Sequence, residues 1–221
     1  MLAIFKREFK SYFQNVIGWL FVAALLAVYG LYFYVYNLKN GYPYISYDLK
    51  GIGFIMMIAV PILTMRSLSD EKKTKTDQLM LTSPVSVGRI VAGKYFAMAA
   101  VYTIVIALFA LSPLVLSIYG KVALSEAYVA LFGYWLYGLS CIAVGLFISS
   151  ISESVIISAI LTFAALFLSY MMQSITGLIS SSGNLLTKVL NCFDLYTPFE
   201  NFVSGCFSVT SAAYYVTVTL L

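Results

Sequence analysis

Five long apolar runs are the feature that most constrains how this chain can fold. They cover residues 16–36, 51–68, 95–119, 127–151 and 154–179. A helix needs about 20 mainly apolar residues to cross the hydrocarbon core of a bilayer, and the runs have about this length. The strands of a membrane barrel would alternate apolar and polar residues, and stretches such as 161–168 do not alternate. The runs therefore predict an all-α integral membrane protein.

A sixth apolar run begins near Ser208 and is still apolar at Leu221. It holds about 14 residues, roughly two thirds of a crossing. We therefore expect six transmembrane helices, the sixth truncated or unusually short, in a single transmembrane domain over residues 1–221. The composition agrees, because only 10% of the residues are charged, whereas soluble domains average about 25%.

The positions of Lys and Arg predict the orientation, since these residues accumulate in cytoplasmic loops. The N-terminal segment and the loop between the second and third runs lie on the same side of the membrane. Together they carry nine basic residues, which are Lys6, Arg7, Lys10, Arg66, Lys72, Lys73, Lys75, Arg89 and Lys94. The opposite loops hold only Lys39, Lys50, Lys121 and Lys188. The N-terminus is thus expected in the cytoplasm. We attribute the net charge of +4 to this excess of basic residues in the cytoplasmic loops. We do not expect a nucleic acid as partner.

Residues 1–15 predict a helix that lies on the membrane surface. At 100° per residue its apolar and aromatic side chains fall on one side and its basic and polar side chains on the other. A plain cytoplasmic extension of the first membrane helix is the alternative.

A polar, basic segment over residues 69–93 separates the second and third runs. Ser69 or Asp70 is placed to cap a helix, and the residues at 78–82 include a short apolar knob before Pro84. An exposed apolar knob on a polar loop implies a partner. Residues 85–90 are expected to run along the membrane surface, and Lys94 to extend toward it at the foot of the third run.

Aromatic residues crowd the predicted external ends of the first and fourth runs. They form either an interfacial belt or the lining of a substrate path, for which the candidates are Tyr29, Tyr32, Phe33, Tyr134 and Tyr137. Small residues of the fourth run predict close helix packing; they are Gly133, Gly138, Ser140, Cys141 and Gly145. In the short hairpin that follows, Ser152 and Glu153 either cap the fifth helix or touch a cytoplasmic partner.

Residues 180–207 predict an external segment with two short amphipathic helices. Cys192 and Cys206 both lie there, and whether they pair is open. The acidic residues of the external loops are expected in solvent; they are Asp48, Glu126, Asp194 and Glu200.

Several blocks resemble the permease subunits of ABC-2 type transporters, especially the branch of gliding-motility and copper-enzyme-maturation permeases. The first block comprises residues 61–66, Glu71, Thr76, residues 79–81, Pro84, Gly93 and Lys94. Two more, 133–153 and 202–215, resemble the later spans of that family, so the likeness covers essentially the whole chain. One departure is Lys75, which stands where the family pattern usually has glycine.

The resemblance implies the ABC-2 (type V ABC exporter) permease fold, with an N-terminal interfacial elbow helix and six spans. It also implies a coupling helix that docks in a cytoplasmic ATPase, in a complex of two permeases, identical or related, and two ATPases. The residues carried over to this contact are Glu71, Thr76, Gln78, Leu79, Met80, Leu81 and Thr82. Arg66 and Lys94 become membrane-surface anchors, and Ser152 and Glu153 a second ATPase contact.

The chain has no glycine-rich phosphate-binding motif, so ATP and Mg²⁺ are expected in a separate ATPase, with no cofactor or metal in this chain. We therefore expect a non-enzymatic exporter subunit in a cell membrane, of bacterial origin. A complex that transmits force or a signal without moving a substrate is the alternative. A membrane hydrolase or an ion-coupled carrier would need His, paired acids or an internal repeat, and we find none of these. The transported substrate stays open.

Overall fold

The computed structural model describes residues 2–75, 86–119, 122–179 and 193–220, and these residues form helices joined by turns. The long elements are α2 (Val16–Phe33), continued by the π-helix η1 (Tyr34–Lys39), α3 (Ser46–Thr64), α6 (Val87–Phe109), α8 (Leu124–Ile151) and α9 (Val155–Ile179). The short ones are α1 (Leu2–Gln14), α4 (Ser69–Lys73), α7 (Ser112–Tyr119), α11 (Thr197–Val203) and α12 (Val209–Leu220).

Five helical stretches are long and apolar enough to cross a membrane. They are Val16–Lys39, Ser46–Lys73, Val87–Tyr119, Leu124–Ile151 and Val155–Met172. The prediction of an all-helical protein with five such spans is confirmed for the described residues. The sixth run forms α12, which has 12 residues, and its role as a sixth span stays a prediction.

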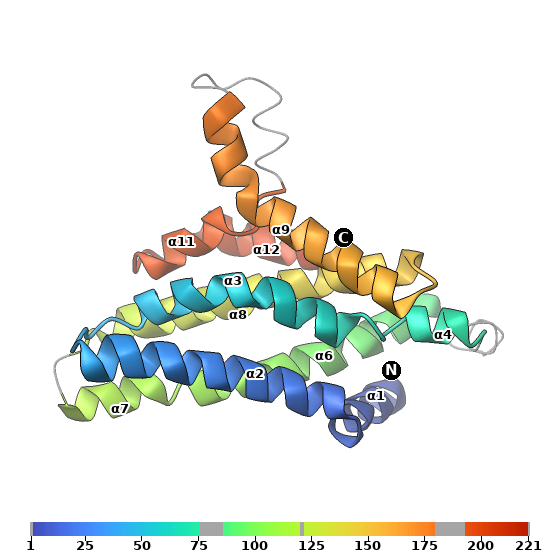
Figure 1. The fold of residues 1–221 in the computed structure, drawn as a ribbon, viewed down its shortest axis with the longest axis horizontal. Coiled ribbons are helices and arrows are strands. Elements are labelled where there is room, and N and C mark those ends of the chain that lie inside the picture. Colours follow the sequence, from blue (N-terminus) through green and yellow to red (C-terminus); the bar gives the residue numbers. More distant parts are fainter. Residues whose placement is uncertain (1, 76–85, 120–121, 180–192, 221) are drawn as a thin grey trace.

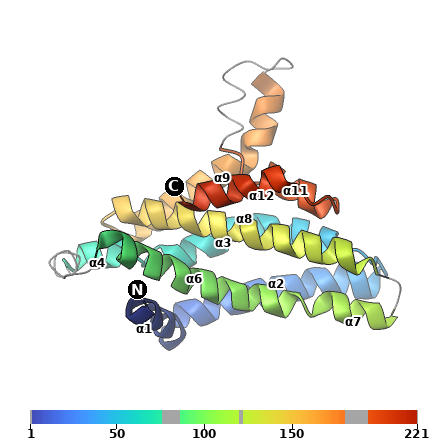
Figure 2. The ribbon, with the colours of Figure 1, turned by 180° about the vertical axis from the view of Figure 1, so that it is seen from behind.

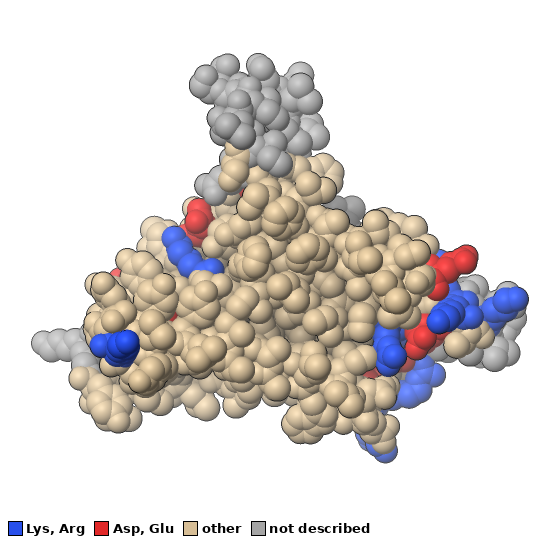
Figure 3. Space-filling view, viewed as in Figure 1, with Lys and Arg blue, Asp and Glu red and all other residues tan. Residues whose placement is uncertain are grey.

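Four of the long helices, α2, α3, α6 and α8, lie side by side along the longest axis of the molecule (Figure 1, Figure 2). One end of this bundle carries α1 and α4, and the opposite end carries α7. Helix α9 starts beside α4 and turns away from the bundle in its last part, while α11 and α12 lie along α8. Charged side chains gather at the two ends of the face in Figure 3, with an uncharged band between them. This distribution suits a bundle whose middle faces lipid.

Helix α8 is the central packing element because its glycines accept side chains from three neighbours. A Cβ atom at Gly133 would lie 2.3 Å from Phe202 of α11, and one at Gly138 would lie 2.3 Å from Tyr102 of α6. One at Gly145 would lie 2.5 Å from Thr64 of α3. Larger residues at these positions would push the helices apart. The predicted close packing along this face of the fourth run is therefore confirmed.

The third run is confirmed as one apolar stretch, Val87–Tyr119, but it contains two helices. Helix α6 ends at Phe109 and α7 starts at Ser112, with Pro113 in its first turn. Proline has no backbone N–H, so it cannot donate the hydrogen bond that a continuous helix needs at its position. Of the segment expected along the membrane surface, residues 85–90, residues 87–90 are the first residues of α6, and their position at the surface stays a prediction. Of the expected coupling segment, residues 69–93, the structure describes α4, Thr74, Lys75, Ser86 and the first turns of α6.

Two acids that we expected in solvent are buried. Asp194 accepts hydrogen bonds from the amides of Tyr196 and Thr197, each at 3.0 Å, and so caps the start of α11. Asp48 is 0% exposed and accepts a hydrogen bond from the side-chain amide of Asn37. The sequence pattern missed both because neighbouring polar residues made these turns look like ordinary loops.

Candidate functional site: an ion cluster at the base of α4

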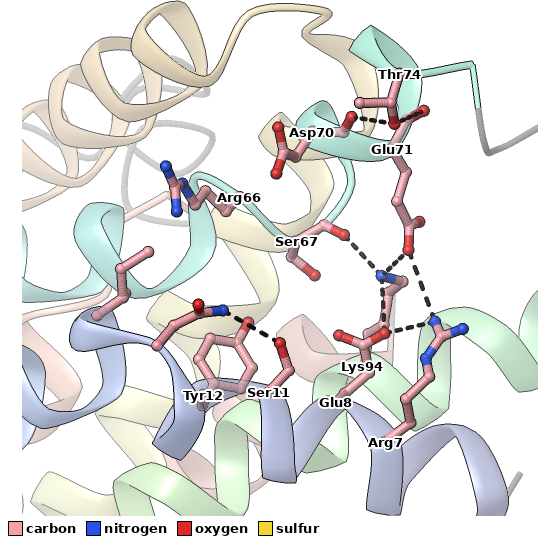
Figure 4. Close-up of a pocket in the computed structure, with 12 residues that line it drawn as sticks. Arg7, Glu8, Ser11, Tyr12, Arg66, Ser67, Asp70, Glu71, Thr74 and Lys94 are labelled. Carbon is pink, nitrogen blue, oxygen red and sulfur yellow. Dashed lines mark hydrogen bonds and ion pairs between the residues drawn. The ribbon is translucent and has the colours of Figure 1, made fainter.

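A buried lysine joins three elements at the end of the bundle that carries α1 and α4. The Nζ atom of Lys94, on α6, lies 2.6 Å from the carboxylate of Glu71 on α4 and 3.5 Å from that of Glu8 on α1. It also donates to the carbonyl of Ser67 at 2.8 Å. Arg7 pairs with Glu8 at 2.7 Å and lies 3.9 Å from Glu71. We call these four charged residues, Arg7, Glu8, Glu71 and Lys94, the ion cluster (Figure 4).

Burial makes the lysine the centre of this cluster. The side chain of Lys94 is 2% exposed, while those of Glu8 and Glu71 are 15% and 18% exposed. A buried ammonium is stable only when carboxylates and carbonyls surround it. Lys94 therefore connects helices α6, α4 and α1 from within the protein. Our expectation that its side chain extends to the membrane surface was wrong.

The backbone of α4 is held from a fourth element. The amides of Leu68 and Ser69 both donate to the hydroxyl of Ser149, on α8, at 3.2 Å. These amides belong to the start of α4, where the helix itself offers no acceptor. The cap that we expected from Ser69 or Asp70 is thus supplied by Ser149, 80 residues farther along the chain.

The aromatic face of α1 packs against the bundle. Phe9, Tyr12 and Phe13 are half-buried and contact the hydrophobic core. The hydroxyl of Tyr12 donates to the carbonyl of Leu63 near the end of α3 at 3.4 Å. Burial raises the pKa of Tyr12, and the nearby Glu8 raises it further, so its phenol remains a neutral donor at physiological pH. Helix α1 is therefore attached to α3 as well as to α4 and α6.

A hollow of about 400 Å³ lies between α1 and the α3 to α4 turn. The ion cluster lines it together with residues from both sides, which are Ser11, Tyr12, Asn15, Ile17, Arg66, Ser67, Asp70 and Thr74 (Figure 4). Arg66, one of the expected anchors, is exposed at this hollow. Its lining holds basic side chains and carboxylates in equal number. This balance favours a structural network of salt bridges over a pocket that binds a ligand of one charge.

Lys75 follows α4 with a backbone φ of +55°. Its amide donates to the carbonyl of Lys72 at 3.1 Å, while Thr74 closes the helix with a bond to Asp70 at 3.0 Å. This left-handed position is where helices commonly end on glycine. A glycine, which the resemblance leads one to expect at this position, would fit this angle, and this chain has lysine there.

The other predicted site residues are distributed as follows. Six of them lie outside the described residues, namely Thr76, Gln78, Leu79, Met80, Leu81 and Thr82, so the knob stays a prediction. Cys192 also lies outside the described residues, and whether it pairs with Cys206 stays open. Ser152 is buried and donates to the carbonyl of Ser154, and Glu153 is exposed at the same end of the bundle as α4. Their contact with an ATPase stays a prediction.

In the part of the chain that the structure describes, the candidate substrate-path residues are buried or half-buried against other side chains. Tyr134 and Tyr137 are 0% and 2% exposed and pack against Phe199 of α11, with ring centroids 5.7 Å apart in both pairs. Tyr29 stacks on Phe109 at 4.0 Å and bonds to Ser112. Tyr32 and Phe33 are half-buried. Tyr134 and Tyr137 therefore lie in the core beneath α11, and Tyr29 lies in the core against α6. A substrate path along these residues stays a prediction.

Sequence reasoning missed Glu8, Ser149 and Asn37. Glu8 had a usable signal, because it is an acid within the basic stretch of the first helix. Ser149 is one of several serines near the end of α8 and carried no distinguishing signal. In the described part of the chain, no group of three or more His, Cys, Asp or Glu residues could hold a metal ion.

Comparison with known proteins adds one match. The family model described as ABC-2 family transporter protein matches residues 32–220. The matched stretch includes α4, Glu71 and Lys94 but begins after α1. No curated protein and no solved structure matches the chain.

Proposed function

The chain belongs to the ABC-2 family of transporter proteins, and from this membership we propose that it is the permease subunit of a transporter powered by a separate ATPase. It is a multi-pass membrane component, as its five long apolar helices require. The ATPase, its two copies, a second permease and the export direction belong to the proposal. So do the membrane-surface position of α1 and the cytoplasmic location of the N-terminus.

The observation that carries the proposal is the attachment of α4 to the rest of the bundle. A segment that receives force from a partner must be joined rigidly to the helices it moves. Helix α4 is joined to α6 and α1 through Glu71 and to α8 through Ser149. Force on residues 69–86 would thus reach three elements by direct polar contacts.

The cytoplasmic placement of this end is supported by its charges. It carries Arg7, Arg66, Lys72, Lys73 and Lys94, matching the positive-inside tendency of membrane proteins. An ATPase that hydrolyses cytoplasmic ATP must dock on this side. Glu153 lies at the same end and is exposed, so it is available for a second contact, while Ser152 is buried beside it.

A force-transmitting complex without a transported substrate is the second candidate function. The packing of Tyr134 and Tyr137 beneath α11 favours it, because these residues are closed off within the chain. Transport would instead require a path between two permease copies. Both functions use the same coupling to ATP.

Copurification tests the proposal directly. The full chain should be isolated from its own cells in a mild detergent, and its partners identified by mass spectrometry. We expect an ATPase with a phosphate-binding loop, in a one-to-one ratio, and ATP hydrolysis by the complex. Stimulation of hydrolysis by a set of peptides, lipids and drugs would favour export. Hydrolysis that no such compound changes, together with no uptake into vesicles, would favour force transmission, and the absence of any ATPase would contradict both.

A further inference from the structure

A buried carboxyl without a cation lies at the end of the bundle opposite the ion cluster. Asp48 stands in the first turn of α3 and is 0% exposed, and Asn37, on the π-helix η1, is 5% exposed. The Asn37 amide nitrogen donates to one carboxylate oxygen of Asp48. The other oxygen of Asp48 and the amide oxygen of Asn37 are both buried, and neither has a hydrogen-bond partner.

The charged groups of this region do not neutralise Asp48. Lys50, on the next turn of α3, pairs with Glu200 of α11 at 3.9 Å, and Lys39 of η1 is exposed. Tyr29 of α2 is another titratable group that interacts electrostatically with Asp48, and its hydroxyl is hydrogen-bonded to Ser112. Among the described residues, no Lys or Arg comes within ion-pair distance of Asp48.

A buried carboxylate without a cation is strongly disfavoured, and such groups take up a proton instead. The start of α3 favours a negative charge at Asp48, but a helix terminus compensates only a small part of the cost of burying an ion. One proton changes an acceptor oxygen of Asp48 into a donor. It therefore removes the charge and one of the two unpartnered acceptors at once.

We propose that Asn37 and Asp48 form a proton-binding site that holds Asp48 as the neutral acid while η1 and α3 are packed together. Separation of these elements exposes the carboxyl to water, and it then ionises and releases the proton. Acid conditions on this side of the membrane therefore favour the packed arrangement. A metal cation fits less well, because hard cations need six or more oxygen ligands and the pair offers two unpartnered oxygens.

Infrared spectroscopy of the full chain in lipid nanodiscs tests the proposal. Near pH 7, wild-type protein should show the carbonyl band of an un-ionised carboxylic acid. The band should shift when ¹³C-aspartate is incorporated, which requires no substitution, and disappear in Asp48→Asn. The same substitution at exposed Asp70 is the control and should leave the band in place.

A second readout uses the proton itself. If folded Asp48 keeps a proton that the unfolded chain releases, raising the pH favours unfolding. The unfolding equilibrium constant of wild type should then rise about tenfold for each unit of pH increase near neutrality, relative to that of Asp48→Asn. Absence of an aspartic-acid band near pH 7 would overturn the proposal. Loss of the band on adding sodium at constant pH would also overturn it, because the pair would then be a cation site.

Discussion

Lys75 has a backbone conformation that glycine adopts more easily than lysine. Its φ of +55° lies in the left-handed region, which costs a residue with a Cβ about 1 to 2 kcal/mol. Glycine avoids this cost but loses about 0.5 to 1 kcal/mol of backbone entropy on folding. The angle is therefore one at which glycine, the residue expected from the resemblance, would fit without this cost.

We expect Lys75→Gly to stabilise the end of α4 by about 0.5 kcal/mol, the difference between these two terms. Hydrogen exchange of residues 69–75 should slow accordingly. Lys73→Gly, two residues earlier and within the helix, is the matched control and should speed exchange, because glycine is a poor helix former. Faster exchange in both variants would show that Lys75 is not strained.

Lys94 is the residue on which the ion cluster depends. Its replacement by methionine keeps an unbranched side chain, shorter by one atom, and leaves the carboxylates of Glu8 and Glu71 without their buried cation. Removing one member of a buried pair costs on the order of 3 kcal/mol. We therefore expect Lys94→Met to lower the thermal unfolding midpoint in detergent by several degrees.

The control for this change is Lys73→Met, at an exposed lysine of α4. It should alter stability by less than about 0.5 kcal/mol. Adding Glu71→Met to Lys94→Met should recover part of the loss, because it removes one uncompensated carboxylate. Equal stability of Lys94→Met and Lys73→Met would mean that the ion cluster contributes little.

At the scale of elements, α4 is a short helix whose start depends on another helix. Its five residues are too few to form a stable helix alone, and Ser149 accepts its first amides. Loss of a capping side chain typically costs about 1 to 2 kcal/mol. We expect Ser149→Ala to speed hydrogen exchange across residues 68–73 by about tenfold.

Ser150→Ala provides the comparison, since the hydroxyl of Ser150 bonds to the Phe147 carbonyl within its own helix. This variant should leave exchange in α4 unchanged. If Ser149→Ala behaves like Ser150→Ala, the start of α4 is held by other contacts, and α8 has no direct part in transmitting force.

The elements themselves were largely predictable from the sequence. Hydrophobic runs located the long helices, and the small residues of the fourth run marked α8 as the place of closest packing. The division of the third run between Phe109 and Ser112 was not predicted, and at this point Ser112 is hydrogen-bonded to Tyr29. A contact between residues 83 positions apart leaves no local pattern.

At the scale of the whole molecule, the site was predictable only in part. The basic residues predicted which end of the bundle, the end with α4, faces the cytoplasm. Glu71 and Lys94 were also predicted as site residues from the sequence. Their direct contact, the participation of Glu8 and the burial of Asp48 depend on how distant segments pack. Charged residues look solvated in a sequence, and only the packing shows that Lys94 and Asp48 are enclosed.

The molecule as a whole is then a bundle with two distinct polar ends. At one end, the ion cluster connects α1, α4 and α6, and the hydroxyl of Ser149 connects α4 to α8. The other end holds an unpaired acid under η1. On our account, a partner pushes on the segment after α4, and the ion cluster passes the movement to the helices of the bundle.

The most direct test of this central claim compares wild type with a Leu79→Asp, Leu81→Asp double variant in a reconstituted complex with its ATPase. These residues form the proposed knob, and acidic side chains should prevent its docking in the ATPase. We predict that the variant folds and unfolds like wild type but loses at least tenfold of the permease-stimulated ATP hydrolysis, together with the ATP-driven activity. Complex assembly and stimulated hydrolysis equal to those of wild type would contradict the account.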